Sequence, residues 1–196
     1  MGNRRESDHY SRRAKDEGHP ARSIYKLEEI DARWKIFKRG QRVLDLGCAP
    51  GSWMQYAAAK VGAEGRVLGF DLSEVKIALP ANAEARVGDI YALTRADLGG
   101  VVDVVVSDMA PHTMGDHKTD ALRSAALAER ALQVAEEHLA PGGCVVVKVL
   151  EGGDVPQIVK QMRTVYEKVE LLRPRATRKH STELFLVGLK KRGAAA

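Results

Sequence analysis

The sequence predicts an α/β protein with a mostly parallel sheet and helices on both of its faces. Short apolar runs alternate with longer amphipathic segments along the 196 residues, as in repeated strand and helix units. The run at residues 101–106, VVDVVV, is apolar without alternation, which is typical of a central parallel strand buried on both faces. The stretch at residues 42–53, RVLDLGCAPGSW, has the order strand, tight turn and helix.

The tight turn at residues 47–51, called the cradle turn below, predicts a binding site for a nucleotide or nucleoside. Gly47 and Gly51 allow the backbone to approach a ligand where a Cβ would collide, and the helix that begins near Ser52 directs free N–H groups at the same space. The turn contains neither G-x-G-x-x-G nor G-x-x-x-x-G-K-[ST], which disfavours a nucleotide-dependent oxidoreductase. The alternative is an ordinary tight turn without a ligand.

The other elements follow from apolar spacing. Residues 21–34 predict an amphipathic helix with Ile24, Leu27 and Ile30 on one face, and the cradle turn is flanked by a strand at residues 43–46 and a helix at residues 53–61. Short apolar runs predict further strands, and helical spacing predicts further helices. The strands are expected at residues 66–70, 84–87, 101–106, 144–149, 168–172 and 183–188, and the helices at residues 120–139, closed by Pro141-Gly142-Gly143, and 155–166.

Polar side chains are expected at the edge of the sheet where the parallel strands end. Asp71 follows the second strand roughly 20 residues beyond the glycines, where α/β nucleoside-binding folds place an acid for ribose hydroxyls, although a helix cap is an alternative. Asp108 follows the run at residues 101–106 and points into the same crevice, which the loop at residues 112–118 is expected to cover. Lys148 interrupts an apolar run, so it either snorkels outward or enters the crevice beside a charge partner.

Composition indicates one soluble domain. The chain is 44% hydrophobic and 29% charged, which is ordinary for a globular protein of this length. No apolar run approaches a membrane span and the N-terminus is charged, so we expect a cytoplasmic protein without a membrane partner, and a monomer because no apolar stripe is left over. Cys48 and Cys144 are expected to be small buried residues rather than a disulfide.

Charge is unevenly distributed. Residues 1–39 hold 11 Lys and Arg against 7 Asp and Glu, residues 40–159 hold 10 against 16, and residues 160–196 hold 10 against 3. If both basic ends fold onto one face, they make an electropositive surface suited to a polyanion, whereas solvated surface charge is the alternative. Residues 1–20 have almost no apolar side chains and predict a flexible basic arm, ahead of a single domain at residues 21–190 and a tail at residues 191–196.

Five segments resemble those of the FtsJ-like RNA 2′-O-methyltransferases. They read DLGCAPGSW at residues 45–53, ARSIYKLEEID at 21–31, SDMAP at 107–111, VVKVLEG at 146–152 and STELFLV at 181–187. The resemblance implies a Rossmann-like class I methyltransferase fold, whose mostly parallel seven-stranded sheet has an antiparallel last strand. The family usually has Asn where this chain has His112, which bears only on the hydrogen bonding of one loop.

The same resemblance implies the site residues and the cofactor S-adenosylmethionine. The implied catalytic tetrad is Lys26, Asp108, Lys148 and Glu183. The implied cofactor-binding residues are Gly47, Gly51, Trp53, Asp71, Asp89 and Asp108, with Asp89 beside the adenine. The implied RNA-binding residues are Arg22, Arg173, Arg175, Arg178 and Lys179. Methyl transfer needs no metal, so His112, Asp116, His117 and Asp120 are not expected to be metal ligands.

The chemistry that follows is methyl transfer to a ribose hydroxyl of RNA. Transfer from a sulfonium is an in-line displacement, so the enzyme must align the reactants and supply a nucleophilic oxygen. Lys148 is the candidate that takes or steers the proton of the 2′-hydroxyl, while Asp108 and Glu183 orient the ammonium groups of Lys148 and Lys26.

The substrate implied by the resemblance is ribosomal RNA. The most similar form is the compact bacterial one, which methylates a uridine of large-subunit (23S) ribosomal RNA in the assembled 50S subunit. Transfer RNA and messenger-RNA cap enzymes use the same tetrad, so these substrates stay open. A non-catalytic RNA-binding or ribosome-assembly factor on the same scaffold is the alternative from another functional class.

Overall fold

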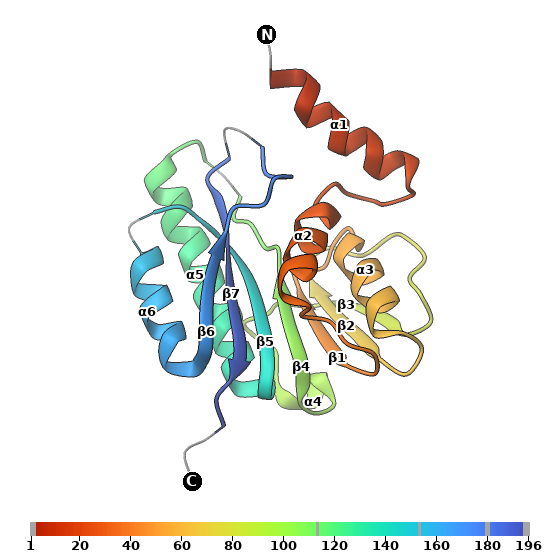
Figure 1. The fold of residues 1–196 in the computed structure, drawn as a ribbon, viewed down its shortest axis with the longest axis vertical. Coiled ribbons are helices and arrows are strands. Elements are labelled where there is room, and N and C mark those ends of the chain that lie inside the picture. Colours follow the sequence, from red (N-terminus) through yellow and green to blue (C-terminus); the bar gives the residue numbers. More distant parts are fainter. Residues whose placement is uncertain (1–2, 113, 153, 179–180, 194–196) are drawn as a thin grey trace.

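The computed structural model describes residues 3–112, 114–152, 154–178 and 181–193, with side chains from residue 9 onward (Figure 1). Its centre is a seven-stranded sheet in the order β3-β2-β1-β4-β5-β7-β6. The strands run parallel except β7, which is antiparallel to both of its neighbours. The predicted fold class, a mostly parallel seven-stranded sheet with an antiparallel last strand, is therefore confirmed.

The first half of the sheet holds the cradle turn. Strand β1 (Arg42–Leu46) lies between β2 (Arg66–Asp71) and β4 (Val102–Ser107), and β2 pairs with the edge strand β3 (Ala83–Val87). Helices α2 (Ile24–Trp34) and α3 (Ser52–Val61) precede and follow β1, and the short helix α4 (Arg95–Leu98) leads into β4.

The second half closes the sheet with the end of the chain. Helix α5 (His117–His138) runs into β5 (Leu139–Leu150), and α6 (Val155–Val165) runs into β6 (Tyr166–Leu172). The last strand, β7 (Glu183–Lys191), inserts between β5 and β6, with Glu183 opposite Leu150 and Phe185 opposite Lys148. The first residue of β7 is thereby placed at the edge where the parallel strands end.

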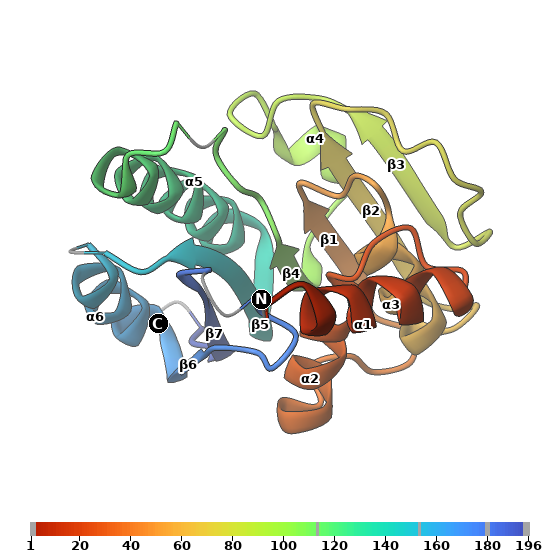
Figure 2. The same cartoon turned by 90° about the horizontal axis from the view of Figure 1, so that it is seen from above.

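Helices cover both faces of the sheet (Figure 2). They pack on it through two clusters of buried hydrophobic side chains. Helices α5 and α6 cover one face, against side chains such as Val145 and Val147 of β5, and α2 and α3 cover the other, against Val146. Strand residues alternate between the two cores because successive side chains point to opposite faces. Lys148 stands two residues after Val146, on the face that α2 covers.

Helix α1 (Asn3–Asp16) stands beside the edge where the parallel strands end, next to α2 (Figure 1). It is not predicted from the sequence, and neither is α4. A small cluster attaches α1, in which Tyr10 and Ala14 pack against Ile24, Tyr25 and Ala176. Two apolar contacts one helical turn apart are too few to form a periodic pattern, so apolar spacing does not predict this helix.

Several element boundaries differ from those predicted. Strand β5 begins at Leu139, five residues earlier than expected, because Leu139 pairs with Val102 before a shift of register. Pro141-Gly142-Gly143 therefore lies within β5 instead of closing a helix. Helix α5 begins at His117, where the side chain of Asp116 accepts a hydrogen bond from the Thr119 N–H as an N-cap.

Two expectations from composition are also addressed by the structure. Cys48 and Cys144 are free thiols, Cys48 buried as expected and Cys144 only half-buried, and burial raises the pKa of both. Within the described ranges, no helix has the length and apolar character needed to cross a membrane.

Candidate active site

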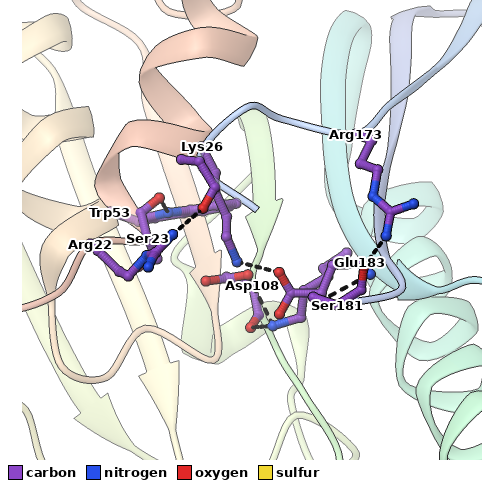
Figure 3. A network of polar contacts seen from close by, with 10 residues as sticks. Arg22, Ser23, Lys26, Trp53, Asp108, Arg173, Ser181 and Glu183 are labelled. Carbon is purple, nitrogen blue, oxygen red and sulfur yellow. Dashed lines mark hydrogen bonds and ion pairs between the residues drawn. The ribbon is translucent and has the colours of Figure 1, made fainter. Parts of the chain in front are cut away.

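Two lysines and two acids, from α2, β5, β7 and the residue that follows β4, meet at the edge where the parallel strands end (Figure 3). Lys26 of α2 donates a hydrogen bond to Glu183 at the start of β7, with 2.6 Å between Nζ and Oε2. The side chain of Lys26 is 10% exposed and that of Glu183 is 23% exposed. A contact this short between mostly buried charged groups is a charge-assisted hydrogen bond.

Lys148 and Asp108 form the second pair. The Lys148 Nζ lies 2.9 Å from Asp108 Oδ1 and also donates to the Asp108 main-chain carbonyl. The Lys148 side chain is only 5% exposed, so it enters the site beside a carboxylate and does not snorkel outward. The pairing of Ser107 in β4 with Val147 in β5 brings the two residues side by side.

The two pairs share one electrostatic environment. Burial is the largest single influence and raises the pKa of Glu183, but the charge and hydrogen bond of Lys26, together with the charges of Lys148 and Arg178, hold this pKa below its ordinary value. Glu183 is therefore a carboxylate at neutral pH, and the second lysine is near enough to contribute to its charge state.

Packing between α2 and α3 fixes the position of Lys26. The Trp53 indole N–H donates to the Ser23 carbonyl at 2.9 Å, and its ring packs on Phe185, with 5.8 Å between the ring centroids. Trp53 is 3% exposed, so its side chain offers little surface to a cofactor and instead joins α3 to the start of α2 and to β7. The sequence motif points to this residue but not to its packing role.

The cradle turn has the backbone that its glycines predict. Gly47 and Gly51 have φ angles of +79° and +107°, which favour glycine. A Cβ on Gly47 would lie 2.3 Å from the Met109 side chain, and one on Gly51 would lie 2.9 Å from that of Ile77. The space that a Cβ would need is thus filled by the side chains of Ile77 and of Met109, the residue that follows Asp108.

Asp71 is tied to the cradle turn. Its Oδ2 accepts from the Ala49 N–H at 3.0 Å and its Oδ1 accepts from the Ser73 N–H at 2.8 Å. Asp89 is exposed, and its Oδ1 accepts from the Tyr91 N–H at 3.0 Å. Both acids therefore keep lone pairs for a ligand, because each Asp71 oxygen and the Asp89 Oδ1 accept one of these hydrogen bonds, and a carboxylate oxygen can accept more than one. Large apolar side chains near them are exposed, namely Leu72, Val87 and Tyr91.

Asp45 is a buried acid next to the cradle turn that the sequence analysis does not single out. It lies in β1 two residues before Gly47, it is 1% exposed, and neither carboxyl oxygen has a hydrogen-bond partner among the described residues. Burial, followed by the charges of Asp108 and Asp71, raises its pKa well above the ordinary value. The signal in the sequence is an acid within the apolar run VLDL at residues 43–46.

The expected RNA-binding residues have different surroundings. Arg22 donates to the Ala176 carbonyl at 2.6 Å and lies over the Tyr10 ring, while Arg173 donates to the Ser181 carbonyl. Arg175 and Arg178 have exposed side chains, and the Arg175 main-chain N–H donates to Glu29 of α2. Lys179 lies outside the described residues.

Asp116, the N-cap of α5, and Asp120, in its first turn, stabilise the start of α5 and the loop before it. Asp116 caps α5, and Asp120 is buried and accepts from the Met114 N–H at 2.9 Å. In the part of the chain that the structure describes, no group of three or more His, Cys, Asp or Glu residues is arranged to hold a metal ion.

The fold and the site define an α/β enzyme with a nucleoside-type turn beside a buried constellation of two lysines and two acids. The sequence profile described as FtsJ-like methyltransferase matches residues 20–191. The chain therefore belongs to the FtsJ-like methyltransferase family.

Relatives and solved structures agree with this assignment. A protein of Desulfatibacillum aliphaticivorans named Ribosomal RNA large subunit methyltransferase E is 46% identical over 191 residues, which cover 96% of this chain and 92% of the relative. One of the same name from Bdellovibrio bacteriovorus is 48% identical, covering 94% and 97%. A Plasmodium falciparum structure described as a ribosomal RNA methyltransferase has a TM-score of 0.79 at 22% identity, covers 89% of this chain and 100% of its own, and supports the fold.

Proposed function

We propose that this protein transfers a methyl group from S-adenosylmethionine to a ribose 2′-hydroxyl of large-subunit ribosomal RNA. The observation that carries the proposal is the pair of buried contacts, Lys26 with Glu183 and Lys148 with Asp108, beside the cradle turn. The names of the relatives favour ribosomal RNA as the substrate class. A uridine of the assembled 50S subunit is the finer target that we propose.

The residues near the cradle turn fit the cofactor. S-adenosylmethionine, when bound, supplies an electrophilic methyl group on a sulfonium and also carries an ammonium group. The unpartnered carboxyl of Asp45 and the free lone pairs of Asp71 and Asp89 are suited to a cationic nucleoside with ribose and amino donors. We assign Gly47 and Gly51 to the backbone of the same site, with Leu72 and Tyr91 as apolar surface for a base.

Lys148 is the proposed group that removes or steers the proton of the 2′-hydroxyl. Its Nζ is fixed by Asp108 through both a carboxylate oxygen and the main-chain carbonyl, which leaves little freedom for the ammonium group. Lys26 and Glu183 hold each other and would position the ribose from the opposite side. Positioning of this kind lowers the barrier because a hydroxyl held in line for displacement has already lost its freedom of motion.

RNA would approach across the edge that holds α1 and the loop at residues 173–182. Arg175 and Arg178 are exposed on that loop, immediately before Glu183. Arg22 and Arg173 already donate to main-chain carbonyls, so we assign them to shaping the loop and the other two arginines to phosphate contact.

Transfer of labelled methyl groups tests the proposal. The protein is incubated with labelled S-adenosylmethionine and with isolated large ribosomal subunits, free ribosomal RNA or transfer RNA, and the product is hydrolysed in alkali. A 2′-O-methyl group blocks attack on the adjacent phosphate, so label is expected in alkali-resistant dinucleotides from the large subunit. Label in mononucleotides would mean base methylation and would contradict the proposed role of the four residues.

Two alternatives give different results in the same assay. Label that is confined to transfer RNA would keep the chemistry and change the substrate. RNA binding without any product, unchanged in a Lys148→Ala variant, would indicate a non-catalytic assembly factor.

A further inference from the structure

Asp45 is the one acid near the cradle turn whose carboxyl oxygens both lack a hydrogen-bond partner among the described residues. Buried carboxyl groups are almost always hydrogen-bonded, so a fully buried exception needs an explanation. Asp45 does not take part in the proposed catalytic pairs, and it lies in β1 two residues before Gly47, the first residue of the cradle turn.

The charged groups around Asp45 are mostly negative. Asp71 lies at the end of β2 on one side and Asp108 follows β4 on the other, and both carboxylates act on Asp45 electrostatically. In the register of the sheet, Asp45 faces Gly69 and Val106, neither of which has a polar side chain. Cys48 of the cradle turn is buried nearby and is uncharged, because burial raises the pKa of its thiol.

The neighbouring acids have partners that Asp45 lacks. The Asp71 carboxylate is held by two backbone N–H groups, and the Asp108 carboxylate is paired with the Lys148 ammonium. Asp45 has neither kind of partner, so its charged form is disfavoured, because a buried charge needs a hydrogen bond or a counterion. The pKa of Asp45 is raised accordingly, with burial as the largest cause.

We propose that Asp45 holds a proton in the free protein and releases it when the cationic cofactor binds at the cradle turn. This inference rests on the proposed use of S-adenosylmethionine. The step is an acid dissociation, in which the O–H bond of the carboxyl group breaks, the proton passes to the buffer and the carboxylate stays. No electrons are transferred.

The driving force is the positive charge of the cofactor. A cation that enters a site with little water interacts strongly with nearby carboxyl groups and favours their ionised form. The same coupling acts in reverse, because thermodynamic linkage is reciprocal. Cofactor affinity is therefore expected to rise with pH, by up to about tenfold per pH unit while one proton is released.

Calorimetric titration of the full chain measures this proton directly. S-adenosylmethionine is titrated into the protein in two buffers of different ionisation enthalpy, at several pH values between 6 and 8.5. The dependence of the binding heat on the buffer gives the number of protons released, which we expect to approach about one per cofactor.

The Asp45→Asn variant is the matched control, because an amide resembles the protonated acid and cannot ionise. It is expected to bind cofactor more weakly than the wild type at high pH, with an affinity that lacks the Asp45 contribution to pH dependence. The amino group of the cofactor titrates equally in both proteins, so the difference between them isolates Asp45. Equal proton release by wild type and variant would overturn the proposal.

Titration with S-adenosylhomocysteine identifies the charge that acts on Asp45, because this product keeps the ammonium group and has lost the sulfonium. Proton release with both ligands assigns the effect to the ammonium, and release with S-adenosylmethionine alone assigns it to the sulfonium. Binding of both without proton release contradicts the inference, whereas failure of either ligand to bind contradicts the proposed cofactor itself.

Stability of the ligand-free protein gives a second test that needs no cofactor. A raised pKa in the folded state means that protonation of Asp45 stabilises the fold at low pH, and that this stabilisation is lost as pH rises toward the folded pKa. The free energy of unfolding in urea should therefore fall with rising pH more steeply for the wild type than for Asp45→Asn. If the variant does not fold, the wild-type titrations still decide, since wild-type binding without proton release overturns the proposal.

Discussion

Lys148 is a charged residue in a position where packing alone would favour an apolar one. It stands in the middle of an apolar strand, is almost fully buried, and has its ammonium group fixed by Asp108. A buried lysine is tolerated only where a partner compensates its charge, so a strand would carry leucine or valine here if packing were its only role.

Substitution of Lys148 by Ala is predicted to nearly abolish methyl transfer while cofactor binding stays intact. Loss of a group that handles a proton in the transition state costs about 10²–10⁴ in rate, so at least a hundredfold loss of single-turnover rate is expected. Lys160→Ala, which removes an exposed lysine of α6, is the control and should keep wild-type activity. Near-normal activity of Lys148→Ala would contradict the proposed mechanism.

Glu183→Gln is predicted to lower stability at neutral pH, because the Lys26 ammonium loses its carboxylate. The lost hydrogen bond between charged groups contributes about 1.5 kcal/mol at a site that is partly exposed. The pKa of Glu183 is below its ordinary value, so this contribution is present above about pH 4.5 and disappears as pH falls through the folded pKa.

The measurement is urea unfolding of wild type and Glu183→Gln as a function of pH. The difference in free energy of unfolding should be constant near neutrality and should shrink below about pH 4. A difference that did not change with pH would mean that the variant acts through packing and not through the ion pair.

The four tetrad positions were implied by the family resemblance, and Lys148 alone also stands out as a charge within an apolar run, whereas apolar spacing by itself predicts Lys26 to be an ordinary solvated lysine. The partners of other residues could not be predicted. The unpartnered state of Asp45 and the contact of Arg22 with Ala176 depend on residues far away in the chain. No local pattern records such contacts.

At the scale of elements, α1 is attached to the domain by a short apolar seam and not by the main core. Tyr10 and Ala14 contact α2 and Ala176 of the loop before β7, and Arg13 lies over the Tyr25 ring. The seam includes Tyr25, the residue before Lys26, so α1 packs directly against the helix that carries one of the tetrad lysines.

Ala14→Glu is predicted to release α1 while the rest of the domain stays folded. A charge forced into the seam between α1 and α2 is costly, so amide hydrogen exchange in α1 should become at least roughly tenfold faster. Lys15→Glu places the same side chain at an exposed position of the same helix and should leave exchange nearly unchanged. Equal effects of both variants would show that charge in α1, and not the seam, determines its order.

The elements that sequence patterns predicted are those with many buried residues. Strands β1, β2, β4 and β5 lie in the centre of the sheet, and their apolar runs mark them within a few residues. Helices α1 and α4 bury few side chains, so periodicity had nothing to detect. The early start of β5 depends on pairing with β4, which is a contact between strands and not a property of the local sequence.

For the whole molecule, we expect the uneven distribution of charge to influence RNA binding more than the net charge of +5 does. The exposed arginines 175 and 178 stand at the edge that also holds the tetrad, while α6 carries exposed basic residues on the other face of the sheet. RNA affinity should therefore depend on where a positive charge is removed.

The double variant Arg175→Glu with Arg178→Glu is predicted to weaken RNA binding and to lower the slope of log affinity against log salt by about 2. The control double variant Lys160→Glu with Arg163→Glu makes the same change of net charge on α6. Binding is measured by fluorescence anisotropy across a salt series. Similar losses in both variants would point to net charge alone.

Because β7 lies between β5 and β6, the sheet and the site cannot be complete until the end of the chain has been synthesised. Lys26 and Glu183 are 157 residues apart, so the first lysine of the site leaves the ribosome long before its acid is synthesised. Until the last strand arrives, β5 and β6 have open edges, which invite wrong pairing. The site cannot be complete before β7 has been synthesised and has paired, so a nascent chain that stops before residue 183 has neither the finished sheet nor the finished tetrad.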